Sequence, residues 1–416
     1  MTLDTFFILF ACAIGLLMTF GVGANDLANI MSTTMGSKAV TAKQAFIIAI
    51  VFEFAGAFLG GTHVTNTIRT GVVNIAMVSP PTFLIYGMLA ILLSGSVWIS
   101  LASYLGMPVS ITNAIVGALV GFGGIALGMH AVHWEIVRYI AISWISCPVI
   151  AGIVAFLLFI TIRQSILSRS NPAKKVRLYV PVYLFLVGTV LSVMVILKGL
   201  AHVGILLNFY QASLVNIATS IIVMFFGLLI IKRIKIKNEN DFHAQLKYVE
   251  KIFSVLMALT ACAMVFAHGA NDVSVAIGPV AAIIGVIQHG GELSRATPIP
   301  YWTILLGCVG VVIGFVMYGR KIIETVGSGI TALTPSRAFA ATLAAATTVL
   351  VSTSTGIPVS ATQTLVGAVL GVGLAGGIGA LNLSVIRNIF MSWVITLPAA
   401  AGLAVCFFYL IRAVFH

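Results

Sequence analysis

Long apolar runs separated by short polar stretches form the main pattern along this chain of 416 residues. A helix that crosses a bilayer needs about 20 consecutive, predominantly apolar residues. The pattern predicts twelve spans, near 4–22, 44–60, 83–103, 108–128, 138–160, 178–197, 212–231, 252–268, 302–318, 338–354, 359–380 and 388–412. The runs lack the alternation of a membrane β-barrel, and an open sheet would leave its edge groups unpaired in lipid. The sequence therefore predicts an all-α polytopic membrane protein.

Composition and charge agree with this class and narrow the partners. Hydrophobic residues make up 60% of the chain and charged residues only 8%, whereas soluble domains carry about 25% charged residues. The net charge of +12 would fit either nucleic-acid binding or basic loops at a membrane surface. The basic residues concentrate beside the predicted spans, so we expect a lipid bilayer and no nucleic acid as partner.

The basic residues also predict the orientation. If the twelve spans alternate in direction, one side holds only Arg69, Arg138, Lys198, Arg295 and Arg412, which leaves 17 of the 22 basic residues on the other side. Cytoplasmic loops carry the excess of Lys and Arg in membrane proteins. We therefore expect a multi-pass protein of the cell (cytoplasmic) membrane with both termini outside the cytoplasm.

Three short motifs occur twice, in the same order. The pairs are GAND at 23–26 and 269–272, GMPVSITNAIVG at 106–117 with GIPVSATQTLVG at 356–367, and RYIAISW at 138–144 with RNIFMSW at 387–393. The sequence thus predicts two copies of one unit, at 1–162 and 252–416, each with five spans. A two-span linker with basic cytoplasmic edges, 163–251, separates them.

Parity then predicts inverted topology. An odd number of spans followed by an even linker makes the second unit enter the membrane from the opposite side. Inverted repeats with broken helices are typical of secondary transporters. The result holds whether 83–103 and 108–128 are two spans or one re-entrant hairpin.

The duplicated GAND motif suggests a cation site. Small residues allow a helix to break and free its carbonyl groups, and Asn25, Asp26, Asn271 and Asp272 add side-chain oxygens, the ligands that Na⁺ requires. A single copy would fit a solvated surface loop better than a cation site. Because both copies lie at repeat-related positions in apolar surroundings, we predict cation binding.

The duplicated Pro-Val-Ser motif suggests an anion site. Proline suits the first turn of a helix, and a helix N-terminus that carries hydroxyl groups binds anions. The candidate residues are Ser110, Thr112, Asn113, Ser360, Thr362 and Gln363. The alternative is that these small residues only permit close helix packing.

Two further residues are open candidates. Glu53 lies midway along a predicted span, where an ionisable residue is a functional candidate by default. It could instead be a protonated acid hydrogen-bonded within the bundle, or lie nearer the surface. His268 precedes the second GAND motif and could either hydrogen-bond within the site or stay outside it. The region that matches Glu53 in the second unit, around Val311, has no acid.

The two duplicated motifs resemble the signatures of the inorganic phosphate transporter (PiT) family. That family's GANDVANA-like signature appears as GANDLANI at 23–30 and HGANDVSVAIGP at 268–279, and its GxPxSxTH as GMPVSITN and GIPVSATQ. FEFAG at 52–56 and GRKIIETVGSGITALTPS at 319–336 extend the resemblance over nearly the whole chain. The resemblance implies cation-coupled phosphate symport, inverted repeats and extracellular termini.

The resemblance also implies residue roles. It gives the cation to Asn25, Asp26, Asn271 and Asp272, the phosphate to Ser110, Thr112, Ser360 and Thr362, and matches Glu53 to an intramembrane glutamate of many members. The chain departs from the family pattern at Asn113 and Gln363, where many members have His. It departs again near Met88 and Thr342, where animal-type members have further glutamates.

We therefore expect a secondary active transporter, not an enzyme, that imports inorganic phosphate with a coupled cation by alternating access. Few titratable groups lie in the core, which favours Na⁺ over H⁺ as the coupling ion, and no cofactor is expected beyond that ion. The alternative is a proton-coupled phosphate or sulfate permease of the same fold, and arsenate is a further candidate anion. A homodimer is compatible with the sequence and is not decided by it.

Overall fold

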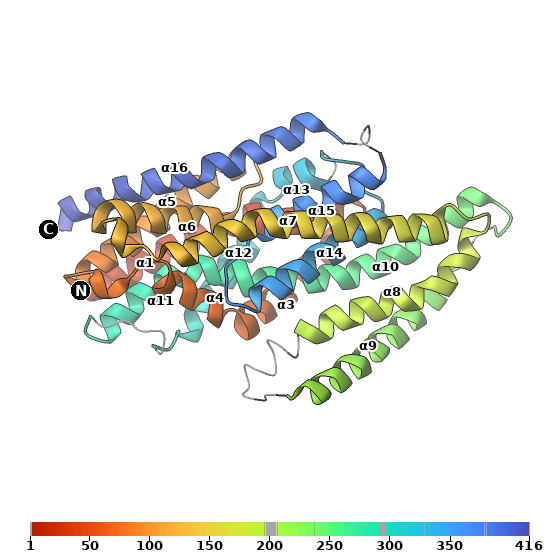
Figure 1. Ribbon diagram of the computed structural model, residues 1–416, viewed down its shortest axis with the longest axis horizontal. Coiled ribbons are helices and arrows are strands. Elements are labelled where there is room, and N and C mark those ends of the chain that lie inside the picture. Colours follow the sequence, from red (N-terminus) through yellow and green to blue (C-terminus); the bar gives the residue numbers. More distant parts are fainter. Residues whose placement is uncertain are drawn as a thin grey trace.

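Helices make up nearly the whole molecule (Figure 1). The computed structural model describes residues 2–194, 196, 205, 207–236, 238–291, 297–327, 329–377, 379 and 381–415. In these residues the only strand-like feature is an isolated bridge between Val73 and Val132. The predicted all-α class is confirmed.

The helices follow one another in two comparable series, joined by two peripheral helices. The first series comprises α1 (Leu3–Val22), α2 (Ala28–Gly36), α3 (Ala42–Gly60), α4 (Thr62–Asn66), α5 (Pro81–Leu105), α6 (Ile111–Gly121) and α7 (Trp134–Ile162). The joining helices are α8 (Pro172–Met194) and α9 (Phe209–Lys232). The second series comprises α10 (Phe242–His268), α11 (Ser274–Gln288), α12 (Tyr301–Tyr318), α13 (Arg320–Gly327), α14 (Pro335–Thr353), α15 (Ala361–Ala375) and α16 (Leu383–Phe415).

Fewer helices can cross a membrane than the apolar pattern predicts. Nine helical stretches of the described chain are long and apolar enough, so the count of twelve spans is not confirmed. Two apolar helices are too short, the stretch Ile111–Leu127 and α15, which has 15 residues. At 1.5 Å per residue α15 covers about 22 Å, less than the roughly 30 Å of a hydrocarbon core.

The short helices belong to two hairpins that turn inside the molecule. The first hairpin is α5–α6 and the second is α14–α15, and they lie in opposite halves of the long axis (Figure 1). Each turn contains a glycine in the left-handed region, Gly106 with φ 72° and Gly356 with φ 77°, which a residue without Cβ adopts freely. We call the residues 106–110 and 356–360 the hairpin tips. The Pro-Val-Ser motifs therefore sit at the tips and not at the ends of full spans.

The GAND segments are continuous helix, which corrects the expectation that the helix breaks there. A single π-helical turn, Gly23–Leu27, joins α1 to α2, and another, Gly269–Val273, joins α10 to α11. The second stretch runs unbroken from Phe242 to Gln288. It thus begins before the predicted span 252–268 and continues well past it. Single π-turns inside α-helices are frequent at functional sites.

Close packing explains the glycines of these turns. A Cβ on Gly23 would strike the backbone carbonyl of Val311 in α12, and one on Gly269 would strike the backbone carbonyl of Glu53 in α3. Small residues let helix backbones approach within a membrane bundle. The same residues that the sequence pattern assigns to a helix break therefore seat each π-turn against a neighbouring helix.

The two series interlock, because each of several helices packs on helices of the other series, and equivalent helices make equivalent contacts. Helix α7 packs on α14 and α15 of the second hairpin, and α16 packs on α5 and α6 of the first. Likewise α1 packs on α12, and α10 packs on α3. These contacts agree with two related units. The predicted limits of the units and the linker, 1–162, 163–251 and 252–416, remain a prediction. Helix α10 begins at Phe242, ten residues before the predicted start of the second unit.

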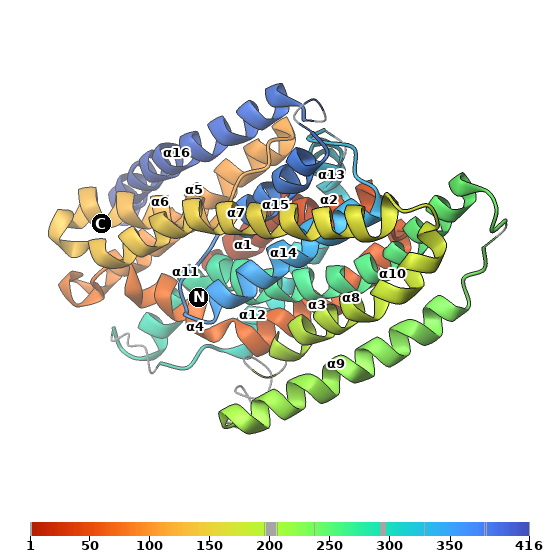
Figure 2. The same ribbon diagram turned by 45° about the vertical axis from the view of Figure 1, so that its right-hand side comes forward.

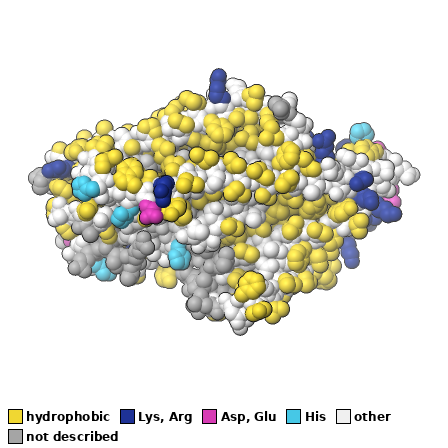
Figure 3. All heavy atoms as spheres, viewed as in Figure 1, with side chains coloured by type: hydrophobic (Ala, Val, Ile, Leu, Met, Phe, Trp, Pro, Cys, Tyr) yellow, Lys and Arg dark blue, Asp and Glu magenta, His cyan; other side chains and the backbone are white. Residues whose placement is uncertain are grey.

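Both chain ends lie toward the same end of the long axis in Figure 1, whereas Lys and Arg side chains gather at the opposite end in Figure 3. Apolar side chains cover most of the surface between them. Helix α9 lies along the outside of the bundle (Figure 2) and is largely exposed. The basic residues Lys198, Lys237 and Arg295 fall outside the described residues.

Candidate functional site

Each GAND asparagine is tied to a hairpin tip. Asn25 donates from Nδ2 to the Met107 carbonyl at 3.0 Å and accepts at Oδ1 from the Val109 N–H at 3.0 Å. Asn271 makes the equivalent bonds to Val359, whose carbonyl accepts at 2.6 Å and whose N–H donates at 3.3 Å. Each π-turn and the tip of its own unit are thus held together by one amide.

Asp26 joins the two units. Its Oδ1 accepts from the Thr362 hydroxyl at 2.8 Å and from the Ile111 N–H at 3.4 Å. Ile111 begins α6, whereas Thr362 lies in the first turn of α15. The side chain is 1% exposed, and its Oδ2 has no hydrogen-bond partner in the described chain. A buried carboxylate oxygen without a partner is costly, and a bound cation would offset that cost.

Asp272 has a different environment, built around His268. His268 Nδ1 lies 2.7 Å from Glu53 Oε1, and its Nε2 lies 3.2 Å from Asp272 Oδ2. Asn271 also donates to Asp272 Oδ1 at 2.6 Å. Glu53 and His268 are fully buried, which excludes the surface position considered for Glu53. The structure therefore connects Glu53, His268 and Asp272 in one buried chain, which the sequence left open for His268.

The hydroxyl groups of the tips begin the short helices. Ser110 caps α6 by accepting from the Asn113 N–H at 3.4 Å, and Ser360 caps α15 by accepting from the Gln363 N–H at 3.1 Å. Thr112 donates to the Val359 carbonyl of the opposite tip at 3.0 Å. Two helix N-termini with their hydroxyl groups therefore meet near Asp26, as the predicted anion site requires.

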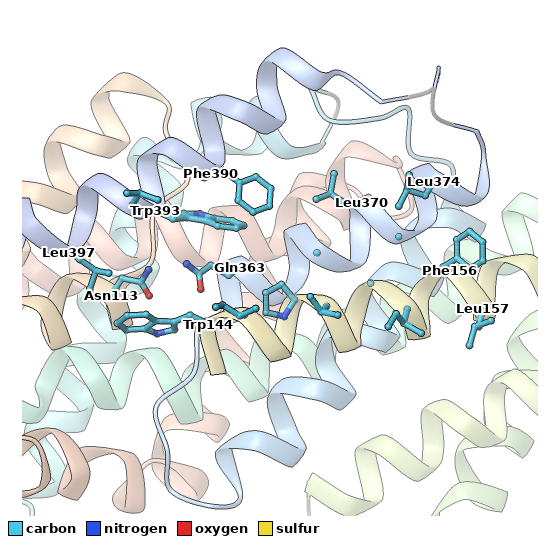
Figure 4. Close-up of a pocket in the computed structure, with 18 residues that line it drawn as sticks. Asn113, Trp144, Phe156, Leu157, Gln363, Leu370, Leu374, Phe390, Trp393 and Leu397 are labelled. Atoms are coloured by element: carbon cyan, nitrogen blue, oxygen red, sulfur yellow. The ribbon is translucent and has the colours of Figure 1, made fainter. Parts of the chain in front are cut away.

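Asn113 and Gln363 lie on another side of these helices. Their side chains line a cavity of about 720 Å³, beside Trp144 and Trp393, between α7, α15 and α16 (Figure 4). Neither Asp26 nor any of the tip hydroxyls lines that cavity. Asn113 Oδ1 and Gln363 Oε1 have no hydrogen-bond partner among the described residues. The structure thus separates these two amides from the rest of the predicted anion-binding set.

The α2 helix adds polar residues that the sequence reasoning missed. Asn29 Nδ2 lies 3.5 Å from the Thr362 carbonyl, and Asn29 Oδ1 has no partner in the part of the chain described. The Thr33 and Thr342 hydroxyls lie 2.9 Å apart. Asn29 and Thr33 follow Asp26 by three and seven residues, the spacing of one helix face. That spacing could have identified Asn29 and Thr33 as neighbours of Asp26, but it has this meaning only if the helix continues past GAND, where the sequence suggests a break.

Among the described residues no group of three or more His, Cys, Asp or Glu is placed to hold a metal ion. The oxygens around the tips are of mixed kinds: carboxylate, amide, hydroxyl and backbone carbonyl. Carboxylate oxygens without a hydrogen-bond partner in the described chain are Asp26 Oδ2, Glu53 Oε2 and Asp272 Oδ2, and Asn29 Oδ1 is an amide oxygen without one on the same helical stretch as Asp26. Such a set suits a hard monovalent cation.

Helical hairpins that turn inside a membrane bundle, with a buried polar cluster where their tips meet, are typical of membrane transporters. The comparisons with known proteins give the particular class. The phosphate transporter family matches residues 22–404, and the chain belongs to that family. The family transports phosphate and is not a family of enzymes.

Individual relatives agree over nearly the full length. A candidate phosphate permease of Haemophilus influenzae is 46% identical, with 97% of this chain and 96% of the relative covered. The chloroplastic inorganic phosphate transporter 2-1 of Arabidopsis thaliana is 38% identical, with 94% and 70% covered. A solved structure described as the sodium-dependent phosphate transporter superimposes with a TM-score of 0.90 at 36% identity, over 98% of this chain and 100% of that one.

Proposed function

We propose that the chain carries phosphate into the cell together with Na⁺ by alternating access. The observation that carries this proposal is the position of Asp26, which accepts from the Thr362 hydroxyl and the Ile111 N–H. Both donors belong to the helix N-termini that would bind the anion. The Thr362 hydroxyl and the Ile111 N–H, which now bond to Asp26, are thus also donors for the anion, so the state of Asp26 affects anion binding.

This arrangement gives a physical reason for coupling. A carboxylate and a phosphate about 4 Å apart repel each other by about 4 kcal/mol at an effective dielectric constant of 20. A Na⁺ ion on Asp26 Oδ2 would offset that repulsion and would weaken the hold of Asp26 on Thr362 and Ile111. The freed donors could then bind phosphate. Couplings between sites typically reach 5- to about 150-fold in affinity.

The sodium-dependent phosphate transporter at 36% identity supports Na⁺ as the cation. The chain Glu53–His268–Asp272 is the feature that would serve the alternative, coupling to H⁺. Alternating access is supported by the hairpins, which lie in opposite halves of the molecule and meet at their tips. Opening on either side would require the tips to separate.

The test is uptake of labelled phosphate into proteoliposomes under an inward Na⁺ gradient, an inward H⁺ gradient, or neither. We expect Na⁺-driven uptake that Asp26→Asn reduces at least about tenfold. The matched control is Asp4→Asn, because Asp4 is exposed near the N-terminus. Uptake without any ion gradient and unchanged by Asp26→Asn would refute the symporter. Uptake driven only by H⁺ would identify H⁺ as the coupling ion in place of Na⁺. Transport of sulfate in place of phosphate would identify a sulfate permease of the same fold.

We also propose that the basic end faces the cytoplasm and both termini face outward. A cysteine introduced at Thr2 should then react with a membrane-impermeant maleimide on intact cells, and one introduced at Lys174 should not. The reverse labelling would invert the orientation.

A further inference from the structure

A cavity lined by basic residues lies at the end of the molecule where Lys and Arg side chains gather (Figure 3). The chain that leaves α9 and enters α10 encloses a cavity of about 390 Å³. Its lining includes Lys235, Lys247, Lys251, His243 and Tyr248. This cavity is remote in sequence from both hairpin tips, and none of the residues assigned to phosphate or Na⁺ lines it.

The three lysines of this cavity, Lys235, Lys247 and Lys251, form no ion pair with another described residue. Two nearby carboxylates bind residues outside the cavity: Glu239 pairs with Arg177 at 3.8 Å, and Glu250 accepts from Ser336 at 2.8 Å. Asp241 accepts from the His243 N–H at 3.0 Å. Only Asp241 among these carboxylates lines the cavity. A concave site lined by three lysines and one aspartate has an excess of positive charge, which attracts an anion.

The position of the cavity indicates whether that anion belongs to a lipid or is a free ion in solution. Helix α9 is apolar and mostly exposed, with Phe225 and Phe226 more than half exposed, as expected of a helix that faces lipid. It ends at Lys232, and Lys235 follows three residues later. Phe242, which is 44% exposed, begins α10 on the other side of the cavity. The cavity therefore opens where a lipid-facing helix reaches the membrane surface.

We propose that this cavity binds the phosphate of an anionic phospholipid headgroup. Its Lys residues surround the phosphodiester, and the acyl chains lie along the exposed apolar face of α9. Basic pockets at the cytoplasmic ends of membrane helices bind phosphorylated headgroups in this way. The cavity lies within the 300–1,000 Å³ range of ligand sites, and a free phosphate ion alone would leave most of it empty.

The experiment is native mass spectrometry of the full-length chain titrated with phosphatidylglycerol, with phosphatidylcholine, or with inorganic phosphate. We expect retention of phosphatidylglycerol over phosphatidylcholine, and at least about tenfold weaker retention in the variant K235Q/K247Q/K251Q. The control variant K43Q/K174Q/K175Q removes three lysines outside the cavity and should retain the lipid like the unmodified chain.

Each other outcome overturns the proposal. Equal retention of the two lipids by the unmodified chain excludes an anionic headgroup site and needs no variant. Equal loss in both lysine variants indicates general charge attraction. Displacement of phosphatidylglycerol by inorganic phosphate at millimolar concentration assigns the cavity to a soluble anion. The measured quantity is lipid binding, so a negative result would not affect the proposal of phosphate transport. A negative result in the uptake experiment would likewise not affect the proposal of a lipid site.

Discussion

Replacing Gly23 by Ala should press a methyl group into the backbone of α12. A Cβ built on Gly23 would overlap the Val311 carbonyl oxygen and lie 2.6 Å from the Val311 carbonyl carbon and 2.8 Å from the Phe315 nitrogen. Ordinary contacts begin near 3.5 Å, so the Val311 carbonyl carbon alone requires a movement of about 0.9 Å, and the overlapping oxygen requires more than about 1 Å. Overpacking of this kind costs about 1–3 kcal/mol. Asn25 and Asp26 follow directly in the same turn and would move with it.

We expect G23A to lower the initial rate of Na⁺-driven phosphate uptake at least about tenfold, because displacements near 1 Å at a working site cost up to about 10²-fold. Gly402→Ala is the matched control: Gly402 lies in α16, and an added Cβ meets nothing within 4 Å. Its uptake should stay within about twofold of the unmodified chain. Rates are compared per amount of reconstituted protein, together with thermal unfolding in detergent. If G23A transports phosphate like G402A, Gly23 is not a packing residue and the reasoning is wrong.

Two further substitutions test the two carboxylate environments separately. His268→Leu would leave Glu53 and Asp272 buried without the imidazole; losing one partner of a buried pair costs about 3–5 kcal/mol, so thermal stability should fall, and Glu53→Gln in the same chain should restore part of it. An unchanged unfolding temperature would contradict this. Thr362→Val removes the hydroxyl that donates to Asp26, and bonds to charged groups contribute about 1.5–3 kcal/mol. Without this donor Asp26 is freer to bind Na⁺ and phosphate loses one donor, so the half-saturating Na⁺ concentration should fall and that of phosphate should rise, each by about tenfold. A shift of both in the same direction would refute the idea that Asp26 and phosphate share the Thr362 hydroxyl.

The sequence predicted the fold class and the family well because these depend on composition and on short motifs. Apolar run length alone identifies most of the spanning helices, and the repeated motifs place Asp26 and Thr362 in related sites. The contact between them joins residues 336 positions apart, which no local pattern reports. It arises because α15 starts beside α2, and that packing follows from the fold as a whole.

The errors have a common physical origin. A run of small residues such as Gly23 and Ala24 is compatible both with a broken helix and with a helix packed closely against a neighbour. Sequence alone does not reveal the neighbour, here the Val311 carbonyl. Likewise Asn113 follows Thr112 directly in the motif, but adjacent positions on a helix point about 100° apart. One side chain therefore lies with the tips and the other lines the cavity with Trp144.

The two halves share a backbone arrangement but differ in the side chains that fill it. Gly23 packs on the carbonyl of Val311, and Gly269 packs on the carbonyl of Glu53, so Val311 and Glu53 occupy equivalent places. His268 lies 246 residues after Val22, the same offset that relates the GAND motifs. The second π-turn therefore has a Glu–His pair beside it, Glu53 from the first unit and His268 from the second, where the first π-turn has Val311 and Val22. Asp272 has an imidazole neighbour at 3.2 Å. Asp26 has no imidazole within hydrogen-bond distance among the described residues, so under the proposed function it is the carboxylate that a cation from outside the protein would neutralise.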